Sequence, residues 1–271
     1  MLFRSDAADF SKKYGGKFQT WEVPTLATSY MMFNVEKGPF TDKRLRLAAA
    51  YAIDHEAIKQ AVFYGRGEIA QGAYASASPW FAAGAKLWPE HDPEKAKSIL
   101  QKAKAVGTEV ILQSLSSYPY LQQTAELVQH MWSEVGFKVA LNLYEQPVLL
   151  QKRRDRDFHA DSTGGSYRWD PDGWFSRNIL STAPANKDSG PGFKNEKADK
   201  LIAEARQTAD KKKRLELYAA VESIVNDELP ILYLHHLTAL QAGAMNLKGY
   251  QPAISGPFST RGGGIRTAWL A

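Results

Sequence analysis

Residues 32–54 read MFNVEKGPFTDKRLRLAAAYAID, and this segment decides the fold. A short apolar strand is predicted to end at Asn34, and a glycine–proline turn follows at residues 38–39. Thr41 or Asp42 can cap the next helix, because either side chain accepts a hydrogen bond from a free N–H of a first helical turn. That helix carries small apolar side chains at helical spacing, so we expect it to pack closely against its neighbours.

The chain beyond this segment alternates between helical and strand patterns. Asp92 and Pro93 open a helix as its cap and its first helical residue. A strand is predicted at 109–112, and apolar residues recur at helical spacing over 121–135. Residues 137–143 alternate between apolar and polar side chains, which indicates a strand with one buried face. Because this order suits parallel strands joined by a crossover helix, the fold class is predicted to be α/β.

Three further segments have regular patterns, and two have none. Strands are predicted at 21–35 and 229–234, and a basic helix at 148–157. Residues 66–91 form a long loop of small residues, which is either a binding loop or a surface-packed connection. Residues 164–192 are rich in Gly, Pro, Asp and aromatic residues and are predicted to be irregular.

Composition excludes several classes of protein. Of the 271 residues, 44% are hydrophobic and 23% are charged, which is ordinary for a globular protein. No window holds the 18 consecutive apolar residues of a membrane span. The chain has no cysteine, so disulfides, thiolate zinc sites and cysteine nucleophiles are excluded. The net charge of +5 is spread out, and the basic run at 211–214 lies where a helix begins. A solvated face is therefore expected there, and no nucleic-acid partner.

No motif predicts a cofactor or a metal. The glycines at 262–264 lack the strand–helix context of a phosphate-binding loop. His235 and His236 are the only adjacent histidines, and neighbours on a strand point to opposite faces. We therefore expect one exposed and one packed imidazole rather than a shared metal ion.

The sequence Trp-Asp-Pro-Asp-Gly at residues 169–173 has three interpretations. It suits a β-turn at every position. Asp170 and Asp172 would also be placed to act as an acid–base pair in a cleft. Finally, the segment would serve as a ligand-contacting loop. Large amphipathic rings and a guanidinium group are typical of binding sites, and the residues in and around the segment supply them: Tyr167, Arg168, Trp169 and Trp174.

Taken together, the motifs resemble the family 5 extracellular solute-binding proteins, the receptors of peptide, nickel and related ABC importers. Asn34 followed by Gly-Pro-Phe at 38–40 and by Ala-Tyr-Ala-Ile-Asp at 50–54 resembles the hallmark of that family. The order of later motifs agrees, and the resemblance runs from about residue 21 to residue 240. These later motifs are the segments 92–100, 125–139, 170–172, 192–206 and 214–231.

The resemblance implies a periplasmic-binding-protein-like lobe with a mixed sheet flanked by helices, in a two-lobed, non-enzymatic receptor. Family members are nearly twice as long, so the chain looks like their C-terminal half. Residues 1–33 would belong to the missing lobe and the hinge crossing, 34–238 would form a complete C-terminal lobe, and 239–271 would return to the missing lobe. Asn34 and Val35 would lie at the hinge.

In peptide-binding members an aspartate anchors the α-amino group of the ligand, and the matching position here is Tyr167. A phenol lacks the negative charge that an ammonium group requires, whereas Arg168 would suit a carboxylate or another anionic group. The predicted ligand contacts are Tyr167, Arg168, Trp169, Asp170 and, from the long loop, Trp80.

The expected partners are a peptide or small polar solute and the membrane permease of an ABC importer. The full-length protein is expected in the periplasm or outside the cell, although the first ten residues, MLFRSDAADF, do not form a signal peptide. Two alternatives stay open. One is a hydrolase that uses Asp170 and Asp172, and the other is a stand-alone lobe that self-associates through the surface meant for the missing half.

Overall fold

A six-stranded mixed sheet divides the molecule into two helical layers. The computed structural model describes residues 12–85, 87–166, 169–252 and 264–271. The strand order is β2-β6-β1-β5-β3-β4. Strand β3 pairs in parallel with β4 and with β5. Strand β1 pairs antiparallel with β5 and with β6, and β2 pairs antiparallel with β6. The strands are β1 (Phe18–Phe33), β2 (Glu68–Ile69), β3 (Glu109–Leu115), β4 (Lys138–Tyr144), β5 (Ala160–Ser166) and β6 (Ile231–Ala244).

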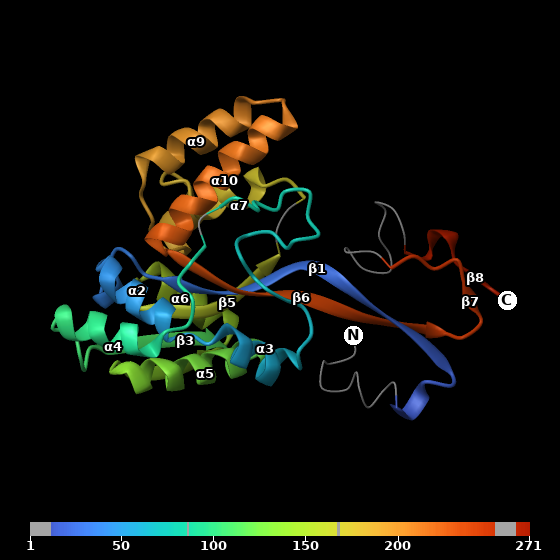
Figure 1. The fold of residues 1–271 in the computed structure, drawn as a ribbon, viewed down its shortest axis with the longest axis horizontal. Coiled ribbons are helices and arrows are strands. Elements are labelled where there is room, and N and C mark those ends of the chain that lie inside the picture. Colours follow the sequence, from blue (N-terminus) through green and yellow to red (C-terminus); the bar gives the residue numbers. More distant parts are fainter. Residues whose placement is uncertain (1–11, 86, 167–168, 253–263) are drawn as a thin grey trace.

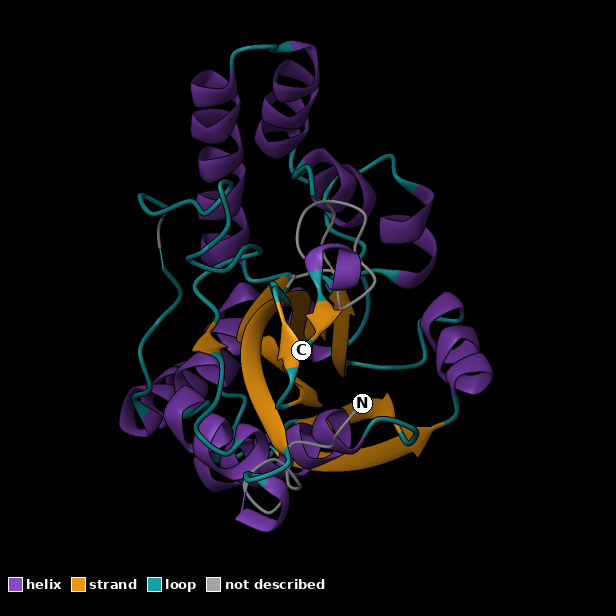
Figure 2. Cartoon of the chain, turned by 90° about the vertical axis from the view of Figure 1, so that its right-hand side faces the viewer, coloured by secondary structure: helices purple, strands orange, loops and turns teal. Residues whose placement is uncertain are grey.

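Helices cover both faces of this sheet (Figures 1 and 2). One face is covered by α2 (Lys43–Ala52), α3 (His55–Phe63), α4 (Pro93–Lys102) and α5 (Pro119–Val135). The other is covered by α7 (Asp172–Asn178), α9 (Glu196–Gln207) and α10 (Lys211–Glu228). Helices α6 (Gln146–Arg154) and α8 (Pro184–Ser189) contact each other. Among the described residues, no helix has the length and apolar character needed to cross a membrane.

The remaining elements are short. They are η1 (Pro39–Thr41), η2 (Ile265–Thr267), and a two-stranded sheet of β7 (Leu247–Lys248) and β8 (Trp269–Leu270).

The helix starts predicted at Asp42 and Asp92 are confirmed, whereas the basic helix predicted at 148–157 runs over Gln146–Arg154. Asp42 rather than Thr41 caps α2, where its carboxylate accepts from the Arg44 N–H at 2.8 Å. Asp54 caps α3 and Asp92 caps α4 in the same way. These caps satisfy N–H groups that have no partner inside the helix.

The small-residue face of α2 packs as expected. Ala48 and Ala49 are fully buried, and the indole Nε1–H of Trp132 in α5 donates to the Ala49 carbonyl at 2.9 Å. The ring of Trp132 also packs on Phe33 and Phe40. Small side chains on α2 therefore let α5 approach closely enough for a side chain to reach the backbone of its neighbour.

Three expectations were wrong in detail. The segment 164–192 is not irregular throughout, because it contains α7 and α8. The strand predicted at 229–234 runs instead over Ile231–Ala244. His235 and His236 do point to different cores, but both are buried. His235 stacks on Phe63, with ring centroids 3.9 Å apart, and His236 shares a 2.6 Å hydrogen bond with the Thr28 hydroxyl.

Strands β1 and β6 continue beyond the other strands as a two-stranded ribbon (Figure 1). Pairing with β5 covers residues 27–33 of β1, whereas pairing with β6 extends from residue 18 to residue 32. Pro24 lies in the ribbon, where β1 has an unpaired edge on one side, and edge strands are where proline is tolerated within sheets. The β1–β6 register shifts between Pro24 and Thr28 and again between Ser29 and Tyr30.

Asn34 links the end of β1 to the rest of the lobe. The side chain is fully buried, and its Nδ2 donates to the Phe158 carbonyl at 3.0 Å. Its Oδ1 accepts from the backbone N–H groups of Glu36 and Lys37, each at 3.2 Å. The next residue, Val35, donates its N–H to the Pro191 carbonyl at 3.0 Å. Asn34 is therefore a fixed point of the lobe.

Glu222 of α10 holds the start of the long loop. Its carboxylate accepts from the Ala73 N–H at 3.0 Å, and the side chain is buried against Gly72. Burial raises the pKa of Glu222 from 4.5 to about 8. Hydrogen bonds from the Ala73 N–H and the Tyr233 hydroxyl lower this pKa and so offset part of the rise. A buried carboxyl group avoids the cost of desolvating its charged form by keeping its proton.

This pKa shift predicts a pH-dependent stability. Between about pH 5 and pH 8 the folded protein keeps a proton on Glu222 that the unfolded chain releases. The contribution of Glu222 to the free energy of unfolding should therefore fall as the pH rises through this window. The fall should show most clearly above pH 6.5, because His55 and His236, whose pKa values are lowered from 6.5 by burial, oppose it below that pH. The substitution Glu222→Gln keeps an acceptor for Ala73 and should flatten the fall, as measured by urea unfolding across the window.

Glu216→Gln is the matched control, because Glu216 is exposed on the same helix. It should leave the pH dependence unchanged. An equally steep fall in the Glu222→Gln variant would show that Glu222 does not carry the effect.

Candidate ligand-binding cleft

A cleft of about 380 Å³ opens beside the last residues of β5. We call it the arginine cleft. Its walls are Tyr30 and Met32 of β1, Arg153 of α6, the β5 segment 163–165, Gly173, Trp174, Arg177 and Asn178 of α7, and Ala185, Ser189 and Gly190 in and after α8. Its volume lies within the range of about 300–1,000 Å³ that is usual for small-molecule sites.

Arg153 brings one positive charge to this cleft. Its Nε–H donates to Asp161 Oδ2 at 2.7 Å, and its Nη2 donates to the Thr163 hydroxyl at 2.9 Å. Asp161 is fully buried and also accepts from Gln113 at 2.8 Å. The ion pair compensates both charges and holds the guanidinium in a fixed orientation at the cleft wall.

Arg177 brings a second positive charge, and this one is exposed. It lies in the last turn of α7, where a cation is favoured by the helix dipole. No carboxylate of the described residues lies within ion-pair distance of it. The cleft lining that the structure describes contains no acidic side chain, so the described wall carries a net positive charge.

Two aromatic rings give the cleft an apolar side. Tyr30 and Trp174 pack edge to face, with ring centroids 5.5 Å apart. The indole N–H of Trp174 donates a hydrogen bond to the Tyr233 hydroxyl at 3.1 Å. Burial raises the pKa of Tyr30 to about 12, partly opposed by Arg153, so its phenol keeps its proton at neutral pH. The cleft thus combines hydrophobic surface with a cationic group, which is typical of sites for small polar molecules.

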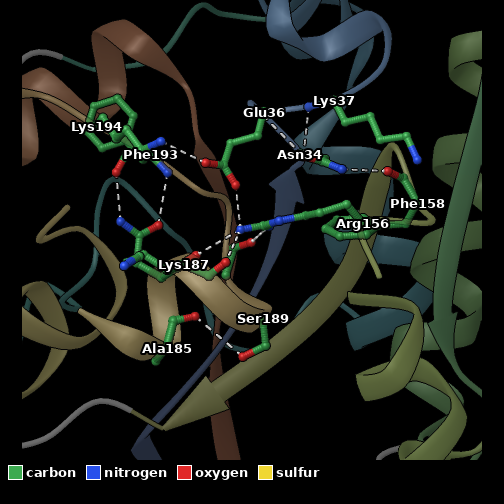
Figure 3. Close-up of polar contacts among 12 residues, drawn as sticks. Asn34, Glu36, Lys37, Arg156, Phe158, Ala185, Lys187, Ser189, Phe193 and Lys194 are labelled. Atoms are coloured by element: carbon green, nitrogen blue, oxygen red, sulfur yellow. Dashed lines mark hydrogen bonds and ion pairs between the residues drawn. The ribbon is translucent and has the colours of Figure 1, made fainter. Parts of the chain in front are cut away.

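The wall formed by α8 is fixed from behind by Arg156 (Figure 3). Its guanidinium donates to the carbonyls of Gly190, at 2.6 Å, and Lys187. It also pairs with Glu36, with Nη2 and Oε2 2.8 Å apart. Gly192 lets Glu36 come this close, because its φ is +75° and a Cβ there would lie 2.5 Å from the Glu36 side chain. The wall is therefore held by contacts within the lobe itself.

A second, smaller hollow of about 40 Å³ lies along β1, on the same face of the sheet. We call it the tryptophan hollow. It is lined by residues 24–26 of β1, by Tyr74, Ala75 and residues 77–79 of the long loop, by Trp169 and by His236. Trp169 is 42% exposed, so much of its ring is open to solvent. Burial lowers the pKa of His236 to about 3, so this imidazole is neutral at physiological pH.

Asp170 positions the segment that carries Trp169. Its carboxylate binds the guanidinium of Arg214 through two hydrogen bonds of 2.7 and 2.8 Å. Arg214 in turn lies over the ring of Trp80, 5.3 Å from its centroid. The hydrogen bonds from Arg214 lower the pKa of Asp170, so it stays ionised. Asp170 and Trp80 therefore belong to one clamp, although neither lines the two described hollows.

The predicted turn at 170–173 is confirmed. The Gly173 N–H donates to the Asp170 carbonyl at 3.1 Å, and the Asp172 N–H donates to the Asp170 side chain at 3.0 Å. The Asp172 carboxylate accepts from the hydroxyls of Ser176 and Tyr218 and lies 3.4 Å from the Arg206 guanidinium. Both carboxylates thus have partners within the lobe, so the geometry gives the hydrolase alternative no support.

The predicted site residues therefore fall into three groups. Trp169 lines a hollow, whereas Asp170 and Trp80 support the loop that carries it. Tyr167 and Arg168 lie outside the described residues, so their predicted ligand contacts stay predictions. Among the residues that the structure describes, no cluster of three or more potential ligands could hold a metal ion.

Sequence reasoning missed Arg153 and Arg177. Arg153 lies in the run QKRRDRD, which reads as the solvated face of a basic helix, and Arg177 lies in a segment that has no periodicity. One signal was present. The consecutive glycines at 164 and 165 indicate a close approach of backbone, and the structure places them in the cleft wall.

Comparison with known proteins agrees with this architecture. The chain is 28% identical over 235 residues to the dipeptide-binding protein of Escherichia coli K12, covering 84% of this chain and 44% of that protein. It is 29% identical over 268 residues to heme-binding protein A of Haemophilus influenzae, covering 95% of this chain and 48% of that protein. The chain thus spans about half the length of these relatives.

A solved structure shows the same fold. The dipeptide-binding protein of Pseudoalteromonas sp. SM9913 in complex with Met-Leu superimposes with a TM-score of 0.82 at 25% identity, over 99% of this chain and 53% of that one. The profile of the bacterial extracellular solute-binding proteins, family 5, middle region, matches residues 2–187. That match covers more than half of the residues of this chain, and the chain therefore belongs to the family 5 bacterial extracellular solute-binding proteins.

Proposed function

We propose that the chain forms one lobe of the receptor component of an ABC importer, and that it binds a peptide or a related small polar or anionic solute without turning it over. The supporting observation is the pair of hollows on one face of the sheet, close to the point where the β1–β6 ribbon leaves the lobe. Relatives named as dipeptide-binding and peptide transport periplasmic proteins support the solute class and a periplasmic location.

In this proposal the ligand lies between two lobes and stabilises their closed arrangement. Closure requires the ligand to have a higher affinity for the closed state than for the open one. The described lobe contributes a pre-formed wall, because Arg156 fixes α8 and Arg214 fixes the segment around Trp169. Pre-formed walls reduce the ordering cost of binding.

The division into lobes also belongs to this proposal. Residues 34–238 form the lobe, and residues 1–33 and 239–271 serve the crossing and the other lobe. The hinge at Asn34 and Val35 stays a prediction. Their buried hydrogen bonds suit the fixed base of a hinge, and the two register shifts over residues 24–30 suit the part that bends.

Binding is tested by calorimetric titration of the complete gene product with di- and tripeptides. Peptide affinities in the micromolar range or tighter, at about −8 kcal/mol or below, are expected. The 271-residue chain alone should bind far more weakly, because it supplies one wall of the site. Saturable hydrolysis of these peptides by the pure protein would contradict a receptor without turnover.

Trp169 is predicted to contact the ligand. Trp169→Ala removes the exposed ring from the tryptophan hollow, and the affinity of the complete gene product for its best peptide should fall about tenfold or more, since buried aromatic contacts are common anchors. Tyr64→Ala is the control, because Tyr64 is an aromatic residue that is 53% exposed after α3 and lines neither hollow. Equal affinities of wild type and Trp169→Ala would exclude the contact.

The ribbon end carries apolar side chains that suit a protein partner. Trp269 and Leu270 of β8 are 59% and 70% exposed, and Met245 is also exposed nearby. We propose that this surface meets another lobe in the receptor, and that the 271-residue chain alone self-associates through it.

Light scattering tests this surface on the 271-residue chain. The average mass should rise with concentration, and replacing both Trp269 and Leu270 by serine should restore a monomer. Leu87→Ser is the control, since Leu87 is equally apolar and 53% exposed in the long loop. A monomeric wild-type chain at high concentration would contradict the prediction.

A further inference from the structure

We propose that the arginine cleft receives a carboxylate group of the ligand, and that Arg177 is the side chain that binds it. This inference rests on the proposed function, because it names the chemical group for which the described wall of the site is built.

The first argument is the charge balance of the cleft. Arg153 and Arg177 both line it, and no acidic side chain is among the described residues of the lining. The charge of Arg153 is already compensated by Asp161, at 2.7 Å and fully buried. Arg177 therefore supplies an uncompensated charge. Such a wall disfavours an ammonium group and favours an anion.

The second argument is the difference in availability between the two guanidinium groups. Two nitrogens of Arg153 already donate to Asp161 and Thr163, so that side chain orients its neighbours. Arg177 is exposed at the end of α7, and no carboxylate of the described residues competes for its donors. Guanidinium groups match the planar geometry of a carboxylate with two parallel hydrogen bonds.

The third argument is the shape and polarity of the surrounding wall. At Gly165 an added Cβ would lie 3.6 Å from the Tyr30 hydroxyl and 3.7 Å from the Trp174 ring, so the glycine leaves this space open. Trp174 and Met32 are 5% and 3% exposed, so each contributes a small edge of apolar surface to the lining, which also includes the protonated phenol of Tyr30. A solute with a short carbon skeleton that ends in a carboxylate meets both parts of this wall.

The carboxylate can belong either to an acidic side chain or to the C-terminus of a peptide, and one experiment separates the two. Calorimetry on the complete gene product would compare Ala-Glu-Ala, Ala-Gln-Ala and the C-terminal amide of Ala-Gln-Ala. The wild type should prefer one carboxylate over its matched amide by about tenfold, as is usual for hydrogen bonds to a charged group. Loss of affinity with glutamine points to the side chain, and loss with the terminal amide points to the C-terminus.

Variants of Arg177 then decide whether the preference arises in this cleft. Arg177→Gln should bind the acid and its amide within about twofold of each other, while its affinity for the amide stays near that of the wild type. Arg177→Lys should keep part of the preference, because it keeps the charge but loses the planar fork. Arg154→Gln is the control: this exposed arginine of α6 lies next to Arg153 but outside the cleft, and its loss should change nothing.

Three results would overturn the inference. A wild type that binds acids and amides equally, or an Arg177→Gln variant that keeps the full preference, would refute it and leave the receptor function standing. Absence of binding to all three peptides would refute both. Because Arg177 is exposed, an unchanged melting temperature of Arg177→Gln is expected and would show that any lost preference does not come from unfolding.

Discussion

The backbone pairing of β1 is the constraint on which the rest of this structure depends. Over residues 28–32 it pairs with β6 on one side and with β5 on the other, so it lies inside the sheet of the lobe. Toward its N-terminal end it keeps only the β6 partner and leaves the lobe as a ribbon (Figure 1). The two hollows lie along this same strand, one at residues 24–26 and the other at Tyr30 and Met32. A single strand therefore sets the distance between the two hollows and the ribbon.

Features encoded by neighbouring residues could be predicted from the sequence. The caps at Asp42, Asp54 and Asp92 act on N–H groups two or three residues away. The parallel β3–β4 pair follows from a periodic helix between two strands. The two short helices were missed because α7 and α8 have seven and six residues, which is too few for a helical period to show. The length of β6 was missed because its last residues pair only with β1 in the ribbon.

The site was harder to predict because its contacts connect residues that are distant in the chain. The turn at Asp170 is local and was visible in the sequence, but its partner Arg214 lies 44 residues further along. The contact with Arg214 shows what Asp170 does in the Trp-Asp-Pro-Asp-Gly motif. Its carboxylate accepts two hydrogen bonds from the guanidinium and so holds its own loop in place. Trp169, the preceding residue of that loop, lines a hollow. Composition alone could not assign these separate roles to adjacent residues.

The two arginines of the cleft show how a lobe can place positive charge in a cleft without a large cost to folding. An arginine buried without a counter-charge would be expensive, and Asp161 removes that cost for Arg153 while fixing its direction. Arg177 needs no such partner, since it stays in solvent at a helix end. The buried pair thus contributes geometry and the exposed arginine contributes net charge. Because Arg156 holds the carbonyls of Gly190 and Lys187 and pairs with Glu36, the wall that α8 forms is held by contacts within the lobe.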